Sequence, residues 1–330
     1  MIANGEGSAS NSASLPRLRS IQVLRGLAAF AVFWHHLTIE AESLVWSGRY
    51  GKFGVEVFFV ISGFIIPYSL FRASYTLRSI PKFLLKRLVR VDPPYIASIV
   101  VAILLPWVST LIPGFRGTAP PLLPAQWLAH LAYLNVYFHY PWLNDVYWTL
   151  AIEFQFYLLI GLLFPVLVAR NNIVRVGSLC AVGLLYLYRS PVHLSGYIHY
   201  FMVGIALFQY RVGLLSRTIW WLVTISLLMW AAGSEGVAGA IAASMSAAAI
   251  SSELPPIPFL EWLGALSYTL YLFHYPILRR IVHLGLRLDN SDIWRLGLMV
   301  IATAVTVACS RALYLMIEKP SQEMAAKIQY

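Results

Sequence analysis

The chain has 330 residues, of which 59% are hydrophobic and 12% are charged, and its formal net charge is +10. Soluble domains carry about twice that share of charged residues, so the composition excludes an ordinary soluble globular protein. The basic residues stand between long apolar runs, a pattern typical of membrane topology signals and not of nucleic-acid binding. We therefore predict an all-α, polytopic transmembrane helical bundle that lies in a lipid bilayer and has no nucleic-acid partner.

The chain begins with sixteen small and polar residues, 1–16, and we expect a disordered N-terminal tail there. This stretch lacks the apolar core of a signal peptide, so the first apolar helix should stay in the mature protein. Residues 17–320 would form one transmembrane domain, and residues 321–330 a short C-terminal tail.

Apolar runs of suitable length and periodicity predict about ten helices. They are expected at 21–39, 53–71, 91–112, 148–169, 174–189, 197–212, 217–232, 237–252, 259–283 and 294–316. The apolar run 125–138 is too short to span comfortably and follows three prolines, so we interpret it as interfacial or re-entrant. Cys180 and Cys309 lie inside apolar runs, and we predict buried thiols with neither a disulfide nor a metal site.

Ten spans place both termini on the same side of the membrane. If the N-terminus is cytoplasmic, most Lys and Arg residues fall in cytoplasmic segments, as the positive-inside rule requires. If 125–138 spanned the membrane, the second half would be inverted, and charge would hardly discriminate between the two topologies. The length of that run favours both termini in the cytoplasm.

Four ionisable side chains are predicted at one depth in the bilayer. Glu56 and Glu153 are carboxylates well inside the predicted spans, and His36 and His274 lie at similar distances from the inner ends of their helices. At about 1.5 Å of rise per residue, all four lie about 22–24 Å from the cytoplasmic face. A carboxylate in lipid normally needs a partner or a task, which favours a shared polar site. His274 could equally be a packing residue, and the inverted topology would separate Glu153 and His274 from the other two.

The first helix carries a cation and an imidazole on one face. Arg25 and His36 are eleven residues apart, which is about 1100° of rotation at about 100° per residue. His35 points about 100° away from His36, so His36 is the better candidate for a channel-lining base. Arg25 considered alone could be an ordinary anchor that reaches the headgroups.

A second basic cluster lies in "KFLLKRLVRVDPPY", residues 82–95. Arg87 and Arg90 are three residues apart and share a face of a helix that enters the third span. The cluster is either a topology signal or a clamp for a polyanion, because guanidinium groups pair well with phosphate oxygens.

Together these segments resemble the bacterial acyltransferase family 3, integral membrane enzymes that acylate cell-surface carbohydrates and some small molecules. The similarity runs from about residue 20 to residue 320, and five motifs occur in the family's order. They are "IQVLRGLAAFAVFWHHL" with Arg25 and His36, "GVEVFFVISGFII" with Glu56, "FLLKRLVRVDPPY" with Arg87 and Arg90, "YWTLAIEFQFYLL" with Glu153, and "LGALSYTLYLFHYPIL" with His274. Asp92 departs from the family pattern, which is usually apolar at that position.

The resemblance implies acyl-coenzyme A, usually acetyl-CoA, as a co-substrate, with no permanently bound cofactor. Arg25, Arg87 and Arg90 would hold its phosphates at the cytoplasmic face. His36 would be the general base for an acceptor hydroxyl, since the reference pKa of imidazole is about 6.5. Glu153 would orient that imidazole, as a carboxylate does in a hydrolase triad. A covalent acyl-histidine is a competing route.

Glu56 and His274 would line the channel or support the catalytic groups. The acceptor would be a carbohydrate or a lipid-linked glycan, for example an exopolysaccharide precursor, at a bacterial inner (plasma) membrane. The aromatic segment 127–148 suits a membrane interface, or a stacking platform for a sugar ring.

Two other classes of protein fit the buried polar residues. A proton-coupled transporter or flippase would use buried Glu and His as a relay, and a non-catalytic membrane scaffold would use none of them.

Overall fold

The computed structural model describes residues 19–111, 123–252 and 254–329, and the predicted N-terminal tail 1–16 lies outside this range. Within the described residues the regular secondary structure is helical and no strand occurs, so the all-α prediction is confirmed. Four helical segments are long and apolar enough to cross a membrane: Val45–Arg72, Leu77–Thr110, Tyr147–Leu167 and Asp292–Ala326.

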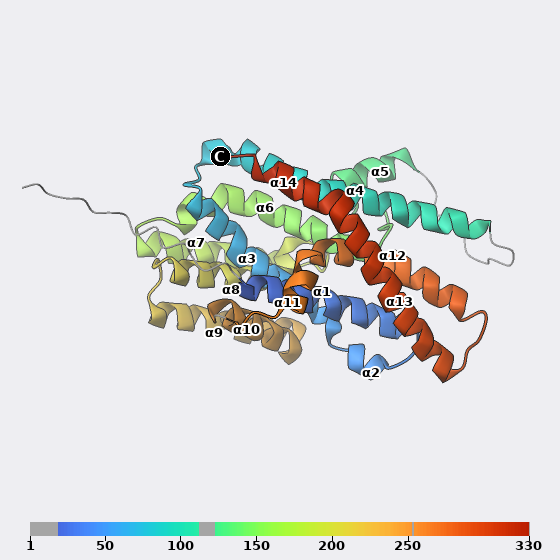
Figure 1. Ribbon diagram of the computed structural model, residues 1–330. Helices are drawn as coiled ribbons and strands as arrows, with labels where there is room; N and C mark the ends of the chain where they lie inside the picture. Colours follow the sequence, from blue (N-terminus) through green and yellow to red (C-terminus); the bar gives the residue numbers. More distant parts are fainter. Residues whose placement is uncertain (1–18, 112–122, 253, 330) are drawn as a thin grey trace, which may run out of the picture.

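The helices pack side by side in a bundle, with α9 and α10 along one edge and α4 and α5 along the opposite edge (Figure 1). The α-helices are α1 (Arg19–Glu40), α2 (Val45–Gly48), α3 (Gly54–Arg72), α4 (Ile80–Thr110), α5 (Pro124–Leu131), α6 (Tyr147–Leu167), α7 (Asn172–Leu184), α8 (Leu194–Arg211), α9 (Arg217–Glu235), α10 (Val237–Ser251), α11 (Pro258–Ala265), α12 (Ser267–Gly285), α13 (Asp292–Leu313) and α14 (Lys319–Ala326). Shorter elements are the 3₁₀ turns η1 (Gly51–Phe53), η2 (Leu77–Ser79) and η3 (Leu185–Tyr188), and the π-helical turn η4 (Tyr314–Glu318).

Each predicted span coincides with helical structure, but three of them have different boundaries. The third helix, α4, begins at Ile80 rather than at 91, so the basic cluster is part of the helix itself. The run 259–283 is divided at Leu266 into α11 and α12. The last helix, α13, continues through η4 into α14, so the range expected to be a C-terminal tail is mostly helical.

The short apolar run 125–138 forms only the eight-residue helix α5 followed by turns. The prediction of buried thiols is wrong for Cys180, which is exposed on α7, while Cys309 is half-buried and both are free. Periodicity in an all-apolar run does not show which face meets lipid, because both faces are apolar.

Close backbone packing joins α3 to α8. A Cβ atom added to Gly63 would lie 2.1 Å from the carbonyl oxygen of Phe201, and one added to Gly204 would lie 2.2 Å from that of Val60. Small residues of this kind let helices in membranes approach closely. The ring of Phe201 also stacks on Phe59 of α3 and on Phe156 of α6, at centroid distances of 4.7 and 4.3 Å. This packing fixes α3 against α6 and so sets the position of Glu153.

The C-terminal helix α14 packs on the beginning of α4. Ser321 and Ala325 are buried in this contact, and the Lys86 Nζ donates to the carbonyl oxygen of Ile328 at 2.9 Å. The two ends of the chain's last helical segment therefore have different neighbours: α13 lies along α12, and α14 covers α4.

Candidate functional site

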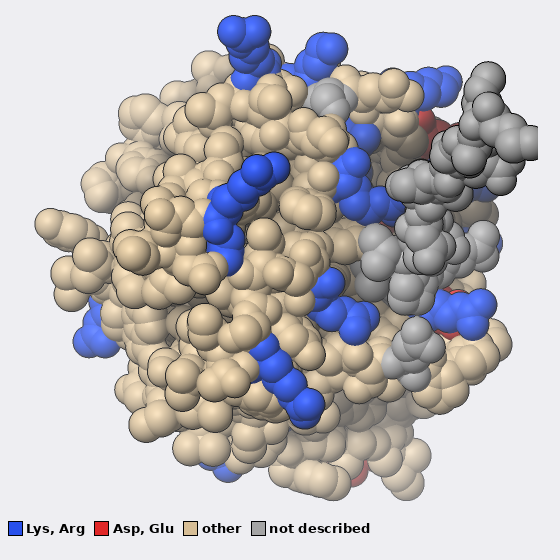
Figure 2. Space-filling view, turned by 90° about the vertical axis from the view of Figure 1, so that its left-hand side faces the viewer, with Lys and Arg blue, Asp and Glu red and all other residues tan. Residues whose placement is uncertain are grey.

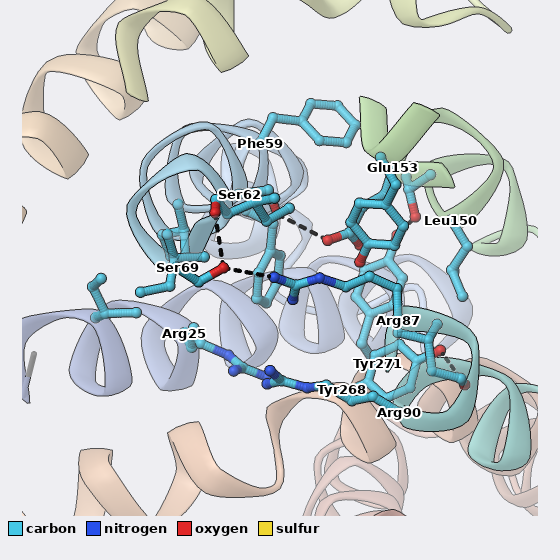
Figure 3. A pocket seen from close by; sticks show the side chains of 18 of the residues that line it. Arg25, Phe59, Ser62, Ser69, Arg87, Arg90, Leu150, Glu153, Tyr268 and Tyr271 are labelled. Atoms are coloured by element: carbon cyan, nitrogen blue, oxygen red, sulfur yellow. Dashed lines mark hydrogen bonds between the residues drawn. The ribbon is translucent and has the colours of Figure 1, made fainter. Parts of the chain in front are cut away.

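A cavity of about 200 Å³ lies between α1, α3, α4, α6, α12 and the η4–α14 segment. Four of the predicted site residues line it: Arg25, Arg87, Arg90 and Glu153. Figure 3 shows the three arginine side chains entering the same space, with Glu153 on the wall beside Ser62. Residues from three separate sequence motifs therefore meet in one cavity.

Two of the three arginines are held by neutral hydroxyl groups. The Arg87 Nη2 donates to Ser69 Oγ at 3.1 Å, and the Arg25 Nε donates to Ser267 Oγ at 3.1 Å. The guanidinium of Arg87 also lies over the rings of Phe83 and Tyr157, with its carbon 5.5 and 5.6 Å from their centroids. These contacts orient the guanidinium groups in the cavity.

Glu153 marks the more apolar part of the cavity. Its Oε1 accepts a hydrogen bond from Ser62 Oγ at 2.9 Å. The wall around it is formed by aromatic and aliphatic side chains, which include Phe58, Phe59, Ile61 and Leu150. The cavity thus joins a cationic region to an apolar region that contains one carboxylate.

His36 and His274 contact each other outside the lining of this cavity. The His274 Nε2 and the His36 Nδ1 are 3.0 Å apart. His274 is fully buried, whereas His36 is half-buried. Tyr271 connects the two regions, because it lines the cavity and its ring centroid lies 6.0 Å from that of His274.

The predicted pairing of His36 with Glu153 is not present among the hydrogen bonds of the described residues. Glu153 bonds to Ser62, whereas the Nδ1 of His36 bonds to the carbonyl oxygen of Val32 and to His274. The two residues belong to neighbouring regions, one inside the cavity and one beyond Tyr271. An equal depth along two helices does not make two side chains neighbours.

Tyr275 packs on the other side of His36, with ring centroids 5.1 Å apart. Its hydroxyl donates to Glu40 Oε1 at 3.1 Å, and Glu40 Oε2 lies 2.7 Å from the Nε2 of His283. His283 is exposed, so this set of polar groups extends from His36 to the surface of the bundle.

Glu56 is separate from both regions. It is buried at the start of α3, does not line the cavity, and its Oε2 has no hydrogen-bond partner among the described residues. The expected group of four ionisable residues is therefore divided into Glu153, Glu56 and the His36–His274 pair.

The sequence did not single out Glu318, although it lines the cavity and is only 1% exposed. Its carboxylate accepts hydrogen bonds from the backbone N–H of Thr269 at 3.0 Å, from the Thr269 hydroxyl, and from Gln322 Nε2 at 2.8 Å. Glu318 ends the π-helical turn η4, and such turns are frequent at functional sites. It lies two residues beyond the last predicted span, which is why a search for carboxylates within spans missed it.

Comparisons with known proteins show the family of the chain. A family model described as an acyltransferase domain matches residues 18–315. Nodulation protein 10 of Rhizobium leguminosarum bv. viciae is 24% identical, with 83% of each chain covered. Acyltransferase MdmB of Streptomyces mycarofaciens is 28% identical over 51% of this chain and 44% of its own length. No solved structure matches.

The family match covers nearly the whole of the helical domain and includes all seven candidate site residues. The apolar helices identify a membrane protein. The chain therefore belongs to the acyltransferase family 3 and is an enzyme that transfers acyl groups.

Proposed function

We propose that this protein is a multi-pass O-acyltransferase of the bacterial inner membrane. It would move an acyl group, in the first place acetyl, from cytoplasmic acyl-CoA to a hydroxyl of a cell-surface or lipid-linked carbohydrate. The observation that carries the proposal is the cavity in which Arg25, Arg87 and Arg90 meet an apolar region beside Glu153, with Glu318 as a second carboxylate in the lining.

The cavity suits the two chemically different ends of coenzyme A. The nucleotide end carries several phosphates, which pair with guanidinium groups through charge-assisted hydrogen bonds. The long arm carries amide groups and ends in the thioester, and the apolar wall beside Glu153 suits it. A carboxylate accepts hydrogen bonds only, so Glu153 would receive an amide N–H of that arm.

The distribution of charge supports a cytoplasmic position for the phosphate end. Figure 2 shows one end of the bundle, on which Lys and Arg are frequent and Asp and Glu are rare. The beginning of α4, which carries Arg87 and Arg90, lies toward this end (Figure 1). Under the positive-inside rule this end faces the cytoplasm, and we propose the same side for both termini.

His36 is the proposed general base. Its imidazole would take the proton from the acceptor hydroxyl while the hydroxyl oxygen attacks the thioester carbonyl. The C–S bond then breaks, and the thiolate of coenzyme A leaves and takes up the proton. Glu153 would act on the donor rather than on His36, since Ser62 is its partner in this structure. An acyl-histidine route can be distinguished from direct transfer, because the acyl group of a labelled acyl-CoA would then stay on the protein when the acceptor is omitted.

The test is transfer of label from radioactive acetyl-CoA to a surface-glycan extract by the purified protein in lipid nanodiscs. We expect the wild-type protein and an Arg217→Ala control, altered at an exposed residue outside the cavity, to transfer label. His36→Ala should abolish transfer and still bind coenzyme A. Full turnover by His36→Ala would refute the catalytic assignment. The transporter alternative instead requires glycan movement across vesicles without acyl-CoA.

A further inference from the structure

The contact between His36 and His274 decides where each ring carries its proton. Neither ring hydrogen-bonds a carboxylate of the described part of the chain, and two imidazolium cations at this distance would repel each other in a buried site. With both rings neutral, each has one N–H donor and one nitrogen with a free electron pair.

The backbone of α12 determines the proton position in His274. Its Nδ1 lies 3.1 Å from the carbonyl oxygen of Leu270 and 2.8 Å from that of Tyr271. A carbonyl oxygen only accepts hydrogen bonds, so the proton of His274 must be on Nδ1. The Nε2 of His274 is then an acceptor.

The neighbours of His36 determine its proton position in the same way. Its Nδ1 lies 3.0 Å from the Nε2 of His274 and 3.0 Å from the carbonyl oxygen of Val32. Both of these atoms are acceptors, so the Nδ1 of His36 carries the proton and donates to both. The Nε2 of His36 is therefore the nitrogen with a free electron pair.

The local structure of α12 keeps His274 in place. Pro276 has no N–H for the carbonyl oxygen of Leu272, and the side chain of Asn144 donates to that oxygen instead, at 2.9 Å. Asn144 and His274 are both buried, which leaves little space for the imidazole to turn.

From these contacts we propose that His274 is a positioning residue, which fixes the tautomer of His36 and so makes the His36 Nε2 the base of the reaction. The inference rests on the proposed function, because it assigns the basic nitrogen of the same site. It replaces the expected carboxylate partner of His36 with a neutral imidazole.

Two variants of His274 separate this role from packing. In His274→Gln the amide oxygen still accepts a hydrogen bond near the former Nε2, whereas His274→Met fills similar space without that acceptor. We expect kcat of His274→Met to fall about tenfold or more, with KM for acetyl-CoA unchanged and with partial recovery in His274→Gln. Equal kcat values for the wild-type protein and His274→Met would overturn the proposal.

Nitrogen-15 NMR of histidine-labelled protein tests the tautomer without catalysis. The signals of His36 are assigned from their loss in His36→Gln, with His139→Gln as the control for an unrelated histidine. We expect the His36 proton on Nδ1 in the wild-type protein and a mixture of tautomers in His274→Met. A proton on the Nε2 of His36 in the wild-type protein would contradict the proposal. If the wild-type protein transferred no label at all, the proposed function would fail instead, whatever the tautomer.

Discussion

Substitution of Arg87 is the most direct test of the donor site, because this positively charged side chain lines the cavity and the contacts that orient it are known. Its guanidinium enters the cavity, is bonded to Ser69, and lies over the rings of Phe83 and Tyr157. Arg87→Ala removes the charge and the planar donor group together. Arg87→Lys keeps the charge but cannot form two parallel hydrogen bonds with one phosphate.

The expected loss of affinity for coenzyme A follows from the free-energy contribution of a hydrogen bond to a charged group, which is about 1.5–3 kcal/mol. For Arg87→Ala this corresponds to a Kd for coenzyme A about 10- to 160-fold higher than that of the wild-type protein. For Arg87→Lys we expect the Kd for coenzyme A to rise by an intermediate factor of about 5- to 10-fold, because a single ammonium contact replaces a bidentate hydrogen bond to the phosphate.

Isothermal titration calorimetry, with coenzyme A titrated into the protein in nanodiscs, measures the Kd of both Arg87 variants. Arg217→Ala is the matched control, since Arg217 is exposed at the start of α9 and outside the cavity. The affinity of the wild-type protein should decrease as salt is added, since screening weakens phosphate contacts. If Arg87→Ala binds coenzyme A like the wild-type protein, or if Arg217→Ala is weakened to the same extent, Arg87 does not hold the donor.

Three further predictions concern the carboxylates and the helix packing. Glu153→Gln should raise the Kd for coenzyme A about tenfold in the same titration, because a charged acceptor becomes neutral; an unchanged Kd would exclude Glu153 from the donor site. Gly204→Ala should lower the stability of the bundle by about 1–3 kcal/mol or more, seen as a lower unfolding temperature in detergent, whereas Gly177→Ala, where a Cβ meets nothing within 4 Å, should not. Glu318→Leu should cost about 1–3 kcal/mol of stability, since the buried N–H of Thr269 loses its acceptor; a melting temperature equal to the wild type would contradict this.

Much of the fold could be predicted from the sequence because hydrophobicity in a membrane protein is a local property. The long apolar runs and the turn residues between them predicted the helices, and the spacing of Arg87 and Arg90 predicted their common face. Arg25 and Glu153 were selected because charge in an apolar segment is costly and needs a partner or a task, but they were expected at opposite ends of a channel, whereas both line one cavity with Arg87 and Arg90.

The neighbours of each side chain were decided only by the tertiary structure. Counting the rise along a helix gives the depth of His36 and of Glu153, but the lateral packing of α1, α6 and α12 places them in different regions. The same packing brings His36 against His274, and the π-helical turn η4 directs Glu318 into the cavity. Depth and face follow from the geometry of one helix, whereas contact depends on which helices lie side by side, and the sequence of a single helix does not contain that information.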